Sequence, residues 1–180
     1  MPDDPPRSRA WKEVPHPRYW WHQLPGHDYV PSIYSDLSEA EWILLREWYA
    51  ETDRNGPIGE GAVPLISFLH GLVMGNGASR IVQLGTQSRS APHVIEAMQM
   101  LRRMNARRGL FSLDIDPAMC EMTRRWIVRA GLDDFVGIAE RNSLDPQSPV
   151  AANEYLGGPP ELIIIDSSHE YQATLEELDL

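Results

Sequence analysis

The chain has 180 residues, 42% of them hydrophobic, which is enough for one domain with a packed core and an additional segment. Its formal net charge of −10 argues against a nucleic-acid backbone or an anionic membrane as the main partner. One cysteine excludes an intrachain disulfide, and no signal peptide or membrane span is predicted, so we expect a soluble, cytoplasmic protein.

Residues 1–35 are rich in proline and aromatic residues and predict an extended arm, because proline at this density prevents regular helix. We expect its tryptophans to dock the arm onto the domain or onto a neighbouring subunit of a homo-oligomer. A role in lining a substrate site is the alternative.

Residues 36–77 predict two helices. A capping box at Ser38–Glu41 opens the first, which runs to about Thr52. The second is expected from about Pro64 to Met74, where a Gly-Asn-Gly sequence ends it.

From residue 78 to the end, apolar runs of strand length alternate with helical patterns. The sequence predicts strands at 80–84, 110–115, 135–139 and 161–165, and helices at 91–107, 117–130 and from about 171. The proline- and glycine-rich stretch before the fourth strand predicts a loop. This alternation indicates parallel strands in a Rossmann-like, three-layer α/β/α domain at 78–180.

Polar residues follow each predicted strand, at the edge where open α/β sheets bind ligands. The fourth strand is almost uniformly apolar, which predicts burial on both faces, and it leads into Asp166 and His169. These two residue types suit a metal ligand and a general base, with a helix cap as the alternative for His169. Asp114, after the second strand, can accept both hydroxyls of a ribose, whereas Asp116 precedes Pro117 and is expected to cap a helix.

Together, these strand ends resemble those of the class I S-adenosylmethionine-dependent methyltransferases. The likeness runs from about Ile58 to the end, and it is greatest to small-molecule O-methyltransferases of the catechol and caffeoyl-CoA type and to a cephalosporin-hydroxylase-like branch. It implies methyl transfer to a hydroxyl of a small molecule, such as a sugar or natural product. Magnesium would assist, with Asp166 as a metal ligand and His169 as the base.

The resemblance also implies a set of cofactor-binding positions. They are Ile58, Gly59, Gln83, Gly85, Ser88, Ser90, Asp114 and Ser143. Two departures from the family pattern stand out: Gln83 occupies the place of an acid, and Ser88-Arg89-Ser90 replaces a Gly-x-Ser turn. The family's remaining metal ligands and last three strands have no counterpart here, so we expect a fragment or a second chain that completes the sheet.

Two other functions fit parts of the pattern. A nicotinamide-dependent dehydrogenase would use a similar fold, but it expects a three-glycine turn that Ser88, Arg89 and Ser90 do not supply. A non-catalytic protein that kept the methyltransferase fold would account for the altered turn and the missing metal ligands.

Overall fold

The computed structural model describes residues 44, 71–86, 108–168 and 170–179. Leu44 belongs to one unit, residues 1–70, and the others belong to a second, residues 71–180. Leu44 is helical and buried, within the range predicted for the first helix. The arm at 1–35 and the predicted helix at 91–107 lie outside the described residues. Where the chain is described, no helix has the length and apolar character needed to cross a bilayer.

The described part of the second unit begins with helical residues 71–76. The helix ends at Gly77, which has a φ of 70° and donates its N–H to the carbonyl of Val73 at 3.0 Å. This is the left-handed cap that glycine favours. The helix thus extends two residues beyond its predicted end at Met74.

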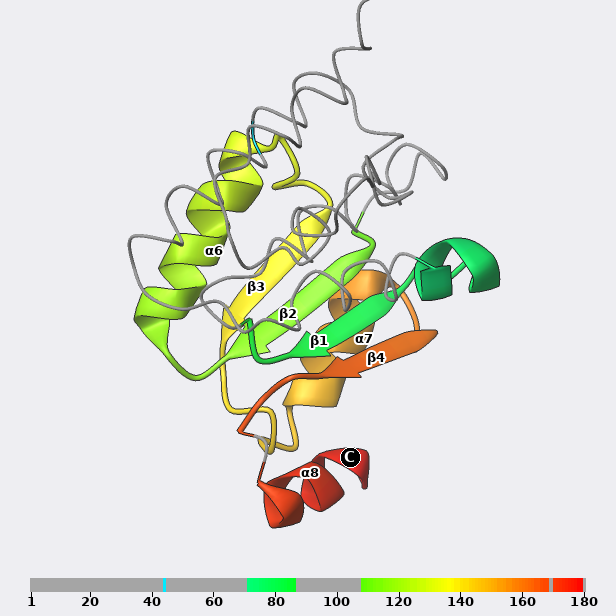
Figure 1. Ribbon diagram of the computed structural model, residues 1–180, viewed down its shortest axis with the longest axis vertical. Helices are drawn as coiled ribbons and strands as arrows, with labels where there is room; N and C mark the ends of the chain where they lie inside the picture. The colour runs from blue at the N-terminus through cyan, green and yellow to red at the C-terminus, as the bar shows by residue number, and fades with distance from the viewer. Residues whose placement is uncertain (1–43, 45–70, 87–107, 169, 180) are drawn as a thin grey trace, which may run out of the picture. The chain divides into compact units, whose positions relative to one another are not determined.

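A four-stranded parallel sheet forms the centre of the second unit (Figure 1). Its strands are β1 (Ile81–Leu84), β2 (Leu110–Asp114), β3 (Val136–Glu140) and β4 (Leu162–Ile165), in the order β3-β2-β1-β4. Each strand lies within one residue of its predicted bounds, and the Rossmann-like α/β arrangement is confirmed. The chain moves outward from β1 to β3 and then returns to β4, which creates a topological switch point between β1 and β4.

Helix α6 (Pro117–Arg129) follows the predicted capping pattern. Asp116 is its N-cap, and the carboxylate accepts the N–H of Ala118 at 2.8 Å. Pro117 lies in the first turn, where its missing N–H leaves no helical bond unmade, and Gly131 follows the helix with a φ of 66°.

Helix α7 (Ser148–Leu156) corrects the prediction of a loop before β4. Pro149 lies in the first turn and therefore does not interrupt the helix. Gly157 ends the helix in the left-handed conformation, with a φ of 74°. Both residues mark helix boundaries, and a composition-based interpretation mistook them for loop signals.

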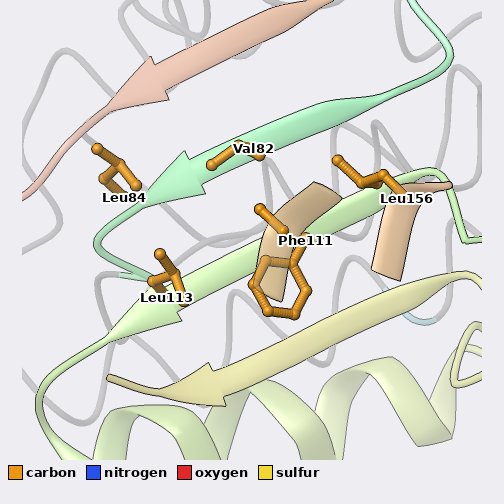
Figure 2. Packing of buried hydrophobic residues seen from close by; sticks show 6 residues of the cluster. Val82, Leu84, Phe111, Leu113 and Leu156 are labelled. Carbon is orange, nitrogen blue, oxygen red and sulfur yellow. The ribbon is translucent and has the colours of Figure 1, made fainter. Parts of the chain in front are cut away.

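The hydrophobic core on one face of the sheet lies between the strands and α7. Val82 and Leu84 of β1 lie beside Phe111 and Leu113 of β2, and Leu156 of α7 packs against this cluster (Figure 2). The chain passes from β2 to β3 through α6 and from β3 back to β4 through α7, so it crosses the sheet in opposite directions. Right-handed crossovers therefore place α6 and α7 on opposite faces. Figure 1 shows α7 behind the strands.

Strand β4 differs from the prediction of burial on both faces. All four residues of β1 are buried, whereas Ile163 of β4 is 55% exposed. The reason is that β4 is an edge strand of the described sheet, and the core cluster covers Val82 but not its neighbour Ile163.

Candidate functional site

A cavity of about 580 Å³ lies at the carboxyl ends of the strands. All four strand ends and helix α8 (Tyr171–Leu178) contribute to its lining. The polar or charged lining residues are Asp114, Arg141, Asn142, Ser143, Asp166, Ser167, Ser168, Glu170 and Glu177. This is the place where the topology of an open parallel sheet predicts a ligand.

The carboxylate of Asp114 organises the turn that follows β1. Its Oδ2 atom accepts the N–H of Thr86 at 2.8 Å and the hydroxyl of Thr86 at 2.7 Å. Its Oδ1 atom accepts the N–H of Asp116 at 2.9 Å. Thr86 is completely buried, so these bonds replace water that the residue cannot reach. Asp114 therefore connects the ends of β1 and β2.

Gly85 has a conformation and a packing position that require glycine. Its φ is 86°, and a Cβ atom added there would overlap the backbone carbonyl oxygen of Asp166. Its N–H donates to the carbonyl of Leu113 at 2.8 Å, which continues the ladder beyond β1. The switch point is closed by direct backbone contact between the turns after β1 and β4.

Glu177 is the charged residue that sequence reasoning missed. It belongs to α8, is only 7% exposed, and accepts hydrogen bonds from two serines. The hydroxyl of Ser143 donates to Oε1, and the hydroxyl of Ser167 donates to Oε2 at 2.7 Å. Nothing in the local sequence distinguishes Glu177 from its neighbour Glu176, because the partners lie 34 and 10 residues away.

The charged residues that line the cavity are mostly acidic. Asp114, Asp166, Glu170 and Glu177 contribute carboxylates. Arg141 contributes a guanidinium, but this group pairs with Asp145 at 2.9 Å. Excess negative charge around a cleft raises the local concentration of cations and opposes the entry of anions.

Four of the predicted site residues come together in this cavity: Gly85, Asp114, Ser143 and Asp166. Gln83 does not line it. Its side chain is buried and donates to the carbonyl of Gly85 at 3.1 Å, while its Oε1 has no hydrogen-bond partner within the described structure. The other predicted residues lie outside the described ranges: Ile58, Gly59, Ser88, Ser90 and His169.

Asp166, the predicted magnesium ligand, is among the residues that the structure describes, and it lines the cavity. Within those residues, no group of three or more histidine, cysteine, aspartate or glutamate side chains could hold a metal ion.

Cys120 behaves as a small buried side chain. Its Sγ atom lies 3.6 Å from the carbonyl oxygen of Asp114 and 3.8 Å from that of Ala139. Burial, together with the negative charge of Asp114, raises the pKa of this thiol above its ordinary value. A raised pKa opposes a role as a nucleophile.

Comparison with models of known protein families finds no match to this chain, and a search of curated proteins finds none either.

Proposed function

We propose that the chain binds S-adenosylmethionine in the carboxyl-end cavity and transfers its methyl group to a hydroxyl of a small molecule. The observation that supports this proposal most is the position of Asp114 at the end of β2, beside the turn that contains Gly85 and in a cavity lined by carboxylates. Acidic residues in this position bind the ribose of nucleoside cofactors in Rossmann-like folds.

Asp114 has room for one further hydrogen bond. A carboxylate offers about four lone-pair positions. Two on Oδ2 are used by Thr86, and one on Oδ1 is used by Asp116. The remaining position on Oδ1 suits one ribose hydroxyl, so we expect a single bond rather than contact with both hydroxyls.

Charge favours S-adenosylmethionine over a nicotinamide dinucleotide. The sulfonium and ammonium groups of S-adenosylmethionine outweigh its one carboxylate, whereas a dinucleotide carries two phosphate charges. Around the cavity, Arg141 is balanced by Asp145, and the other charged lining residues are acidic. A pyrophosphate would therefore enter an unfavourable potential.

When bound, S-adenosylmethionine supplies an electrophilic methyl group. The chain contributes orientation: Asp114 would hold the ribose and Ser143 would lie beside the adenine, which fixes the direction of the methyl group. His169 follows Asp166 by three residues and is our candidate for accepting the proton of the acceptor hydroxyl. Positioning of two reactants can contribute up to about 7–11 kcal/mol.

A second candidate is a methyltransferase-fold protein without catalytic activity. This candidate is favoured because two predicted site residues have structural roles. Asp114 holds Thr86, and Gly85 makes room for the backbone of Asp166, so both residues have a reason to be present without any cofactor.

A calorimetric titration tests the proposal. S-adenosylhomocysteine should bind to the full chain, and NADH should not. Asp114→Asn should weaken that binding, whereas Asp116→Asn, which alters a helix cap outside the lining, should not. Binding of NADH without S-adenosylhomocysteine would favour a dehydrogenase. Binding of S-adenosylhomocysteine without methyl transfer to any hydroxyl acceptor would favour the non-catalytic protein.

A further inference from the structure

Helix α8 is attached to the sheet in an unusual way. Its large apolar side chains are exposed: Tyr171, Leu175 and Leu178 are 79%, 39% and 66% exposed. These residues are spaced by four and three positions, so they lie along one face of the helix. The buried residue of α8 is instead the charged Glu177. Apolar burial therefore contributes little to holding α8 in place.

The carboxylate of Glu177 joins two loops that are otherwise separate in the sequence. Ser143 belongs to the loop after β3, and Ser167 to the loop after β4. Each serine donates its hydroxyl to a different oxygen of the same carboxylate. Hydrogen bonds to a charged acceptor are stronger than those between neutral groups, and a carboxylate buried without them would be costly.

Glu177 and Ser143 also lie between two cavities. Both residues line the carboxyl-end cavity, and both line a second cavity of about 270 Å³ on the α7 side of the sheet. The second cavity is mainly apolar and includes Val82, Leu84 and Ile163. The hydrogen-bonded pair thus forms part of the wall that the two cavities share.

We propose that Glu177 is a positioning residue that holds α8 and the loops after β3 and β4 together, and so fixes the wall of the cofactor cavity. The effect on ligand binding rests on the proposed function, because Ser143 is the expected adenine-side contact. The attachment of the loops does not, because it follows from the hydrogen bonds alone.

Two readouts on the full chain test this inference. The variants are Glu177→Ala, Glu177→Gln and the matched control Glu176→Ala. Glu176 carries the same charge on the same helix, but it is exposed, and within the described structure its carboxylate accepts a hydrogen bond from Gln172 of the same helix. The first readout is hydrogen–deuterium exchange without ligand, and the second is affinity for S-adenosylhomocysteine.

Glu177→Ala should speed exchange in residues 141–145, 166–168 and α8 while leaving β1 and β2 protected. It should also weaken binding of S-adenosylhomocysteine by about tenfold or more, because hydrogen bonds to a charged group are lost. Glu177→Gln keeps one acceptor oxygen and should partly restore both properties. Glu176→Ala should change affinity by less than about twofold, since exposed polar contacts contribute little.

Exchange in residues 141–145 and 166–168 that is the same in Glu177→Ala and Glu176→Ala would overturn the inference. So would faster exchange in Glu177→Ala with unchanged affinity, because the loops would then not determine the cavity wall. If the wild-type chain fails to bind S-adenosylhomocysteine, the proposed function fails, and the exchange comparison still decides whether Glu177 holds the loops.

Discussion

Replacement of Asp114 by alanine should destabilise the protein in the absence of any ligand. The substitution removes the acceptor for three hydrogen bonds: two from Thr86 and one from the N–H of Asp116. Thr86 is fully buried, so water cannot replace the bonds to its hydroxyl and N–H without local opening. The N–H of Asp116 lies at an exposed helix start and can be hydrated.

The magnitude follows from the two buried donors. A buried donor without a partner costs about 1–3 kcal/mol, and neighbouring losses do not add fully. We therefore expect Asp114→Ala to lower the free energy of unfolding by about 2–4 kcal/mol. Small domains have a total stability of about 5–15 kcal/mol, so the variant should remain folded but measurably weaker.

Urea unfolding followed by far-ultraviolet circular dichroism measures this difference. The matched control is Asp116→Ala, which removes the same charge two residues away and loses one helix-cap bond, to the N–H of Ala118. It should cost about 0.5–2 kcal/mol. If Asp114→Ala is no more destabilising than Asp116→Ala, the reasoning that Asp114 anchors the turn after β1 is wrong.

Three further predictions concern other parts of the second unit. Gly85→Ala should destabilise the protein by about 1–3 kcal/mol more than Gly131→Ala, as measured by urea unfolding. The reason is that a Cβ atom at Gly85 meets the backbone of Asp166, whereas one at Gly131 meets open space. Glu161 accepts hydrogen bonds from Ser79, and these bonds lower the pKa of the Glu161 carboxyl from its ordinary value of 4.5. The free energy of unfolding should therefore fall as the pH drops below 4.5, which unfolding at a series of pH values measures. Cys120 should react slowly with a thiol reagent at mildly alkaline pH, because burial and the charge of Asp114 raise the pKa of the thiol above its ordinary 9.0. The absorbance of the reagent follows the reaction.

Each of these predictions has a control. Both glycines have positive φ values, so alanine at either position costs about 1–2 kcal/mol in backbone conformation. The difference between the two variants therefore measures the steric overlap at Gly85. Glu161→Gln should flatten the acid dependence, and an unchanged pH profile in this variant would count against the prediction. Denatured protein should react with the thiol reagent quickly, and equal rates in folded and denatured protein would show that Cys120 is accessible.

The sequence predicted the sheet well because the signals for it are local. Apolar runs of strand length and the proline at the start of α6 depend on neighbouring residues alone, and each predicted strand lies within one residue of its observed position. Helix α7 was missed because Pro149 and Gly157 occur both in loops and at helix ends, and composition does not distinguish these uses.

The candidate site was predicted in part for the same reason. Parallel strands bring their carboxyl ends to one edge, so Gly85, Asp114 and Asp166 were expected together and do line one cavity. Partners within the site could not be predicted. The bond from Thr86 to Asp114 spans 28 residues and that from Ser143 to Glu177 spans 34, and nothing local in the sequence specifies such pairs.

A crystal structure of the chain with S-adenosylhomocysteine tests the central claim most directly. We predict that the nucleoside lies in the carboxyl-end cavity, with one ribose hydroxyl donating to Oδ1 of Asp114 and the adenine beside Ser143. A nucleoside bound elsewhere on the chain, or a cavity that stays empty at saturating ligand, would contradict the account.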